Sequence, residues 1–216
     1  MLPPRSQATV AGVSGQIPLV DYLVLGDAPP EVVAVEVNLS CPNVEARRDV
    51  FAHSATATRD AVEATAGCGR PRWAKLSPNV TDLTEIAAAA LAGGADALTL
   101  VNTVMGMAID PESRRFRLGA GGGGLSGAAI RPVAVRAVHE CRQAFPVAGI
   151  VGVGGISTGE HAVELLLAGA DAVQVGTATF ADPRAPYRVL DGLRRWCAAH
   201  GVIRAGDLIG RAHGGA

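Results

Sequence analysis

Short apolar runs alternate with longer amphipathic stretches along the chain. The runs are rich in Val, Leu and Ala and show little polar alternation, which is typical of parallel strands that are buried on both faces. They predict these strands: Ala8–Ala11, Val32–Asn38, Trp73–Leu76, Ala97–Asn102, Ala148–Val153 and Ala172–Gly176.

The stretches between these runs carry apolar residues at helical period. The segment from Asp82 to Ala92 ends at two glycines, a common helix stop. Ser157-Thr-Gly-Glu160 has the spacing of a capping box that opens a helix closing at Gly169. The two longer helices are expected over Ala128–Ala144 and Tyr187–His200.

Strands and helices alternate without a composition break, which predicts one parallel α/β domain over residues 1–216. An open doubly wound sheet and a closed (β/α)8 barrel both fit this alternation. A barrel usually needs about 250 residues and eight strands, whereas the pattern supplies about six β/α units. The motifs described next favour a barrel that lacks two units.

Composition and charge exclude several classes of function. The chain has 19 basic and 20 acidic residues and only 4% aromatic residues, so neither nucleic acid nor a membrane surface is an expected partner. The four cysteines and five histidines are scattered, with no CxxC, which argues against a zinc or iron–sulfur site. The N-terminal residues lack a signal-peptide core, and the apolar stretch 86–100 is interrupted and too short for a bilayer. We therefore expect a cytoplasmic protein.

The first candidate site follows the strand that ends at Asn38. In a barrel, the carboxyl ends of the strands face the active site. The Asn38 amide can donate and accept hydrogen bonds, which suits a planar heterocycle. Cys41, in the turn that follows, is a candidate general base if its thiolate is favoured. The alternative for Cys41 is a small buried residue at a strand end.

Two further strands end in polar side chains. Lys75 lies in an otherwise apolar strand, where burial is costly without a partner. Its ammonium either lies beside an electron-rich cofactor ring or extends to solvent. Asn102 and Thr103 close the next strand and either bind the same planar ligand as Asn38 or form a turn or helix cap.

Glycine-rich segments end the last two predicted strands, at Val151-Gly-Val-Gly-Gly-Ile-Ser157 and Gln174-Val-Gly-Thr-Ala178. Glycines there let backbone N–H groups approach a phosphate closely, and a helix N-terminus adds a favourable dipole. On this interpretation, valine at Gly155 excludes the phosphate. The run Gly119–Gly124 fits GxGxxG but lacks the preceding strand, so a flexible loop is expected there.

Several segments together resemble the class 1 dihydroorotate dehydrogenases, and most closely the class 1B catalytic subunit. They are VEVNLSCPNVE, KLSPNVTDLTEIA, LVNTVMGMAID, GGLSGAAIRP and GVGGISTGEHAVELLLAGADAVQVGTATF. The resemblance runs from about Ala8 to about Asp182. It implies an FMN-containing TIM barrel that oxidises dihydroorotate to orotate in pyrimidine biosynthesis.

The resemblance also implies a role for each site residue. Cys41 would be the base that removes the C5 proton while hydride leaves C6 for flavin N5; class 2 members have serine at this position. Asn38, Asn102 and Thr103 would bind the substrate ring. The FMN would be contacted by Asn38, Lys75, Val101, Gly127, Gly154, Gly155, Gly176 and Thr177.

Class 1B enzymes are similar in requiring a second subunit that carries FAD and an iron–sulfur cluster and passes electrons to NAD. A homodimer or hetero-oligomer is therefore expected. Family chains are longer at the N-terminus, where two further β/α units supply more FMN and substrate contacts. Two alternatives follow: a non-catalytic remnant or interaction protein with the same fold, and a related flavin barrel that acts on another dihydropyrimidine.

Overall fold

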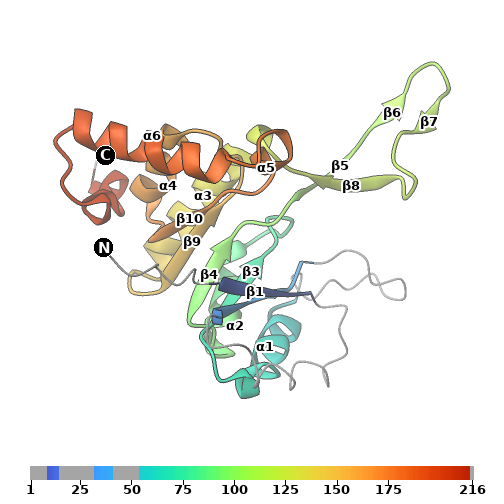
Figure 1. The fold of residues 1–216 in the computed structure, drawn as a ribbon. Helices are drawn as coiled ribbons and strands as arrows, with labels where there is room; N and C mark the ends of the chain where they lie inside the picture. Colours follow the sequence, from blue (N-terminus) through green and yellow to red (C-terminus); the bar gives the residue numbers. More distant parts are fainter. Residues whose placement is uncertain (1–8, 15–31, 41–53, 215–216) are drawn as a thin grey trace. The chain divides into compact units, whose positions relative to one another are not determined.

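The computed structural model describes residues 9–14, 32–40 and 54–214, and it divides into two compact units (Figure 1). The first unit comprises residues 1–76 and 82–99, and the second comprises residues 77–81 and 100–216. The segment 77–81 therefore belongs with the C-terminal part of the chain, although it directly follows a strand of the first unit.

The first unit is a sheet whose strands lie side by side in chain order. They are β1 (Thr9–Ser14), β2 (Val32–Asn38), β3 (Arg72–Leu76) and β4 (Ala97–Leu100). Both pairings of β2 are parallel, and all four residues of β4 are buried, as expected for a strand covered on both faces. The connections contain α1 (Ala55–Glu63), the 3-10 turn η3 (Ala66–Cys68) and α2 (Leu83–Ala92).

Side-chain caps determine where the helices of the first unit begin. The Ser54 hydroxyl accepts a hydrogen bond from the backbone N–H of Ala57 and opens α1. The Asp82 carboxylate accepts from Thr84 and Glu85 and opens α2. These bonds lower the pKa of Asp82, the one from the Thr84 hydroxyl most. Both caps satisfy backbone donors that a helix start leaves unpaired.

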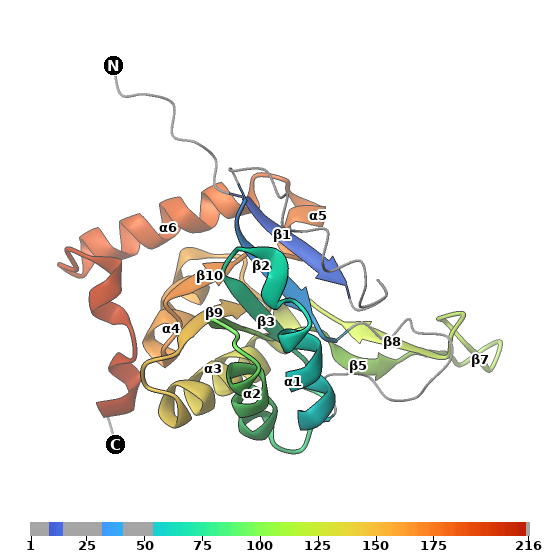
Figure 2. The same cartoon turned by 90° about the horizontal axis from the view of Figure 1, so that it is seen from below.

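The second unit combines two parallel strands, an antiparallel arm and most of the helices. The strands are β9 (Gly149–Val153) and β10 (Ala172–Gln174). The helices and 3-10 turns are η4 (Ala128–Ile130), α3 (Arg131–Ala144), α4 (Gly159–Ala168), α5 (Ala178–Ala181), α6 (Ala185–Ala199), η5 (Ala205–Leu208) and η6 (Arg211–Gly214). Helices α4 and α6 pack side by side (Figures 1 and 2).

An antiparallel arm extends away from the helices of the second unit (Figure 2). It is built from β5 (Val104–Met107) paired with β8 (Gly122–Leu125), and from β6 (Ile109–Asp110) paired with β7 (Arg115–Phe116). Its exposed large apolar side chains are Met105, Met107, Ile109, Phe116, Leu118 and Leu125. Two-stranded ribbons are only marginally stable in water, so this apolar surface is a candidate for contact with other protein.

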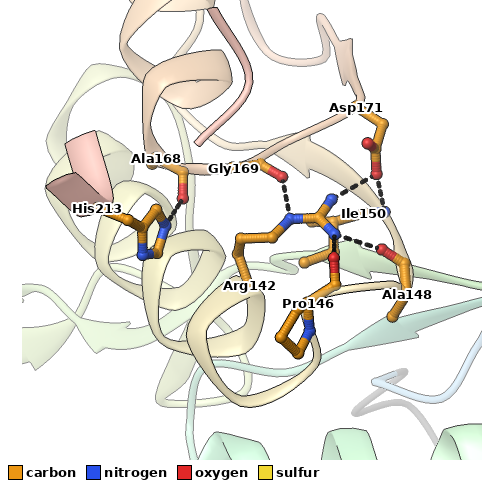
Figure 3. Close-up of polar contacts among 8 residues, drawn as sticks. All are labelled: Arg142, Pro146, Ala148, Ile150, Ala168, Gly169, Asp171 and His213. Atoms are coloured by element: carbon orange, nitrogen blue, oxygen red, sulfur yellow. Dashed lines mark hydrogen bonds and ion pairs between the residues drawn. The ribbon is translucent and has the colours of Figure 1, made fainter. Parts of the chain in front are cut away.

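Arg142, near the end of α3, joins three backbone segments of the second unit (Figure 3). Its guanidinium donates to the carbonyl oxygens of Gly169, Pro146 and Ala148 at 2.8–2.9 Å. It also pairs with Asp171 at 2.7 Å, and the same carboxylate oxygen accepts from the backbone N–H of Ile150. A side chain that is only 12% exposed therefore ties α3 to the segments before β9 and after α4.

The structure confirms the predicted strand Val32–Asn38 in full and places the other predicted strands to within a few residues. The strand from Ala97 ends at Leu100 and not at Asn102, and β10 ends at Gln174 and not at Gly176. The predicted helix over 128–144 begins at Arg131, after a 3-10 turn. The helix predicted from Tyr187 begins two residues earlier, at Ala185.

Two local predictions are wrong. The cap of α4 is Thr158 and not Ser157, because the Thr158 hydroxyl accepts from the backbone N–H of His161. The glycine run expected as a flexible loop includes β8, which is paired along its length with β5. Glycine is needed there because a Cβ at Gly124 would collide with the side chain of Thr103.

The prediction of one domain over residues 1–216 stays a prediction. In the part of the chain that the structure describes, we find no helix with the length and apolar character to cross a bilayer.

Candidate functional site

A row of polar side chains crosses three neighbouring strands of the first unit. Alternation along β2 buries Val35 and Val37 and leaves Glu36 and Asn38 on the other face. The parallel register places Asn38 opposite Lys75 on β3. The Lys75 ammonium lies 3.5 Å from a Glu36 carboxylate oxygen, and the second oxygen accepts from the Thr99 hydroxyl at 3.0 Å.

The contacts in this row exclude one of the two positions that the sequence left open for the Lys75 side chain. Lys75 does not extend to solvent, because its ammonium pairs with Glu36 and the two side chains are 24% and 12% exposed. A partly buried lysine is tolerable when a carboxylate compensates its charge. The first unit therefore holds a fixed cation at the end of β3. Glu36 was not predicted as a site residue; the signal was a carboxylate two residues before Asn38 in an apolar strand.

The turn after β2 is fixed to the end of β3. The Asn38 side-chain oxygen accepts from the backbone N–H of Ser40 at 3.2 Å. The backbone N–H of Leu39 and the hydroxyl of Ser40 both donate to the Lys75 carbonyl at 3.3 Å. Cys41, the predicted base, directly follows this anchored turn and lies outside the described residues.

In the second unit, Asn79 organises the segment that contains Asn102 and Thr103. Its side-chain amide donates to the Ser77 hydroxyl and to the Thr103 carbonyl, both at 2.9 Å. Its oxygen accepts from the backbone N–H of Met105 at 2.8 Å. The Asn102 side chain accepts from the backbone N–H of Thr103. Sequence reasoning missed Asn79; the available signal was an amide directly after Pro78.

The two glycine segments predicted to bind phosphate follow the paired strands β9 and β10 in the second unit, and Gly127, which was predicted to line the FMN, lies close to the second of them. Gly127 lies beside Thr177, since a Cβ built at Gly127 would be 3.5 Å from the Thr177 methyl group. Among the residues that the structure describes, no atom lies within 4 Å of the corresponding position at Gly176. We call Gly127, Gly154, Gly155, Gly176 and Thr177 the glycine cradle. Val101 is buried, and its N–H donates at 2.8 Å to the carbonyl of Val153, the residue before Gly154.

The cradle fits a phosphate that is approached by backbone N–H groups, but two details of the prediction need correction. The helix after Gly176-Thr177 is α5, which has only four residues, so its dipole is small. Gly155 has a φ of 71°, and a Cβ there would lie 2.6 Å from the Cβ of Arg131. Valine at Gly155 would therefore disturb the packing on α3 in addition to any effect on a phosphate.

Comparisons with known proteins give a consistent result. The sequence model for dihydroorotate dehydrogenase matches residues 10–196. The dihydroorotate dehydrogenase B (NAD(+)) catalytic subunit of Pelobacter propionicus is 47% identical over 188 residues, which are 85% of this chain and 60% of that protein. The subunit of the same name from Bacteroides thetaiotaomicron is 42% identical over 205 residues, covering 93% and 67% of the two chains.

A solved structure shares the fold. The crystal structure of DHODH from Eimeria tenella in complex with ferulenol superposes with a TM-score of 0.74 at 25% identity, covering 89% of this chain and 57% of that chain. The chain thus spans about three fifths of the length of the first relatives it matches. These matches confirm the prediction of the α/β-barrel fold and of the resemblance to the class 1B catalytic subunit.

Proposed function

Because the chain belongs to the dihydroorotate dehydrogenase family, we propose that it oxidises dihydroorotate to orotate in pyrimidine biosynthesis, with FMN as cofactor. The observation that carries the proposal is the glycine cradle, in which residues from three separate sequence motifs lie close together: β9 and β10 are paired strands, and Gly127 lies beside Thr177. Backbone N–H groups at such strand ends are suited to a phosphate. FMN, when bound, supplies the hydride acceptor of the reaction.

We assign the FMN phosphate to the glycine cradle and the flavin ring to Lys75, Val101 and Asn38. A cation near the ring favours the reduced, anionic form of a flavin through charge attraction. Glu36 keeps the Lys75 ammonium at a defined position at the end of β3. Glu36 is therefore a positioning residue for Lys75 in this proposal.

Asn38, Asn102 and Thr103 are assigned to the substrate, whose ring N–H and C=O groups match their donors and acceptors. Cys41, as the thiolate, takes the proton from C5 while hydride leaves C6, so that the C5–C6 double bond of orotate forms. The turn Asn38–Ser40, which directly precedes Cys41 in the sequence, is anchored to the Lys75 carbonyl of β3. In the second unit, the Asn79 side chain donates to the Thr103 carbonyl and so fixes the backbone at Thr103.

The partners are proposed by analogy with the relatives, some of which are named as catalytic subunits of an NAD(+)-dependent enzyme. We propose a second subunit with FAD and an iron–sulfur cluster that passes electrons to NAD, in the cytoplasm. The exposed apolar side chains of the arm support assembly into a homodimer or hetero-oligomer.

The proposal is tested by anaerobic mixing of the FMN-loaded chain with dihydroorotate or dihydrouracil, with flavin absorbance as the readout. We expect dihydroorotate to reduce the flavin faster than dihydrouracil. Cys41→Ser is expected to retain FMN and to slow reduction by roughly 10²–10⁴-fold at neutral pH, because a serine hydroxyl is a far weaker base. Reduction by Cys41→Ser at the wild-type rate would refute the role of Cys41. Faster reduction by dihydrouracil would favour a related flavin barrel.

A further inference from the structure

Four polar side chains form a connected cluster beside the glycine cradle. Arg131, the first residue of α3, has one guanidinium nitrogen 2.6 Å from His161 Nε2 and another 2.9 Å from a Glu164 carboxylate oxygen. His161 lies in the first turn of α4, and its Nδ1 is 3.2 Å from the Ser157 hydroxyl. The cluster therefore connects α3, α4 and the turn Gly154–Ser157, which follows β9.

Hydrogen-bond donors face both ring nitrogens of His161. The Arg131 guanidinium lies against Nε2, and the backbone N–H of Ser157 donates to Nδ1 at 3.3 Å, with the Ser157 hydroxyl 3.2 Å from the same nitrogen. An imidazolium carries an N–H on both nitrogens and would oppose both donors. The arrangement therefore favours the neutral imidazole, which joins Arg131 to Ser157.

The same turn is in contact with α3 at its other end. Gly154 and Gly155 have φ angles of 138° and 71°, which favour glycine. A Cβ at Gly154 would be 2.8 Å from the Ala134 Cβ, and one at Gly155 would be 3.0 Å from the Arg131 Cα. The turn from Gly154 to Ser157 is thus held by backbone packing on α3 and by the His161–Ser157 hydrogen bond.

We propose that His161 is a positioning residue for the FMN phosphate: as the neutral bridge between Arg131 and Ser157, it holds the Gly154–Ser157 turn in the conformation that receives the phosphate, and its protonation weakens FMN binding. This inference rests on the proposed function. It gives a role to a histidine that the sequence analysis did not single out.

Protonation of His161 would remove the bridge. It places an N–H on Nε2 directly against the guanidinium of Arg131, where both groups are donors and both are positive. The charged groups that act on His161 are Arg131 from α3 and Glu160 and Glu164 from its own helix. Burial, and then Arg131, lower the pKa of His161 below its ordinary value, while the two glutamates oppose this.

The direction of the pH effect follows from that shift. The folded protein favours the neutral imidazole, so the arrangement is fully present above the ordinary histidine pKa of about 6.5 and is lost as the pH falls through the lowered pKa. FMN affinity is therefore expected to decrease on acidification below neutral pH.

The test is a fluorescence titration of the full chain with FMN and with riboflavin, which lacks the phosphate, at about pH 7.5 and about pH 5.5. The FMN phosphate itself takes up a proton near pH 6 and so changes the affinity in every variant. Each result is therefore compared with His161→Gln, in which the phosphate contributes equally to the pH dependence. Glutamine can accept and donate in place of histidine but does not titrate. His200→Gln, on α6, is the matched control that keeps His161.

For the wild type and His200→Gln, we expect FMN affinity to fall on acidification about tenfold more than for His161→Gln, the effect of about one hydrogen bond. Riboflavin affinity should show no such difference. Ser157→Ala should bind FMN about tenfold more weakly than the wild type at the higher pH, with unchanged riboflavin affinity and an unchanged melting temperature of the FMN-free protein.

Several outcomes would overturn the inference. The same pH dependence in the wild type and His161→Gln would remove the role of His161 while leaving the proposed function intact. If Ser157→Ala loses affinity for FMN and for riboflavin equally and melts at a lower temperature, the cluster stabilises the fold and does not position the phosphate. Absence of FMN binding at both pH values would overturn the inference and the proposed function together.

Discussion

Glycines in the second unit are required for different physical reasons, although they look equivalent in the sequence. Gly155 has a positive φ, and a Cβ there would lie 3.0 Å from the Arg131 Cα, so the fold itself requires glycine there. In the described part of the chain, no atom lies within 4 Å of a Cβ built at Gly176. Packing among the described residues therefore gives no reason for glycine at position 176, and we attribute it to the proposed ligand.

This difference gives a paired prediction. Gly176→Ala should leave the melting temperature of the FMN-free protein unchanged and weaken FMN binding, because the new methyl group enters space that the phosphate would use. Gly155→Ala should destabilise the protein by about 1–3 kcal/mol through backbone strain and contact with α3. Thermal unfolding and flavin titration of both variants check this. Wild-type FMN affinity in Gly176→Ala would contradict the cradle.

Single residues also show how far sequence reasoning reaches. The positions of Asn38 and Lys75 at strand ends follow from alternation and the ends of apolar runs. The partner of Lys75 does not, because it depends on the register between β2 and β3, which brings Glu36 within 3.5 Å. Asn79 was missed for a similar reason: its contacts with Thr103 and Met105 join segments more than 20 residues apart.

At the scale of elements, the apolar runs predicted the strands of both units well, because buried parallel strands need continuous apolar sequence. The arm was not predicted, since β5 and β8 contain several glycines and are exposed. The start of α4 was displaced by one residue because two hydroxyl residues, Ser157 and Thr158, stand together and only the geometry decides which of them caps the helix.

Arg142 allows a prediction about how the elements of the second unit are held together. Arg142→Met removes the hydrogen bonds to three carbonyl groups and the pairing with Asp171 (Figure 3). We expect a loss of about 2–4 kcal/mol in the free energy of unfolding. The control is Arg136→Met on the same helix, whose exposed pair with Glu140 should contribute little to stability because solvent screens it. Urea unfolding of both variants measures the difference, and equal effects would contradict the role of Arg142.

At the scale of the whole molecule, the arm is the feature that most directly suggests assembly. It carries six exposed large apolar side chains, whereas isolated exposed residues such as Ile203 are common on protein surfaces. The family and fold class were predicted from the sequence because the motifs were specific in combination. The arm surface required coordinates.

The arm gives a prediction of oligomeric state. Light scattering of the purified chain should give the mass of two or more chains of 21.9 kDa each. Met107→Lys combined with Phe116→Glu should shift the mass toward that of one chain, because charges disrupt an apolar contact. Ile203→Lys, the control, should leave the mass unchanged. A single-chain mass for the wild type would contradict the prediction that this chain associates with itself through the arm.

We propose that this chain holds FMN in the glycine cradle and uses it to oxidise dihydroorotate. The most direct test is the visible absorption spectrum of the purified chain, supplied with FMN, before and after anaerobic addition of dihydroorotate. We expect a bound-flavin spectrum that bleaches when the substrate is added. A colourless protein that takes up no FMN, or a bound flavin that stays oxidised, would contradict it.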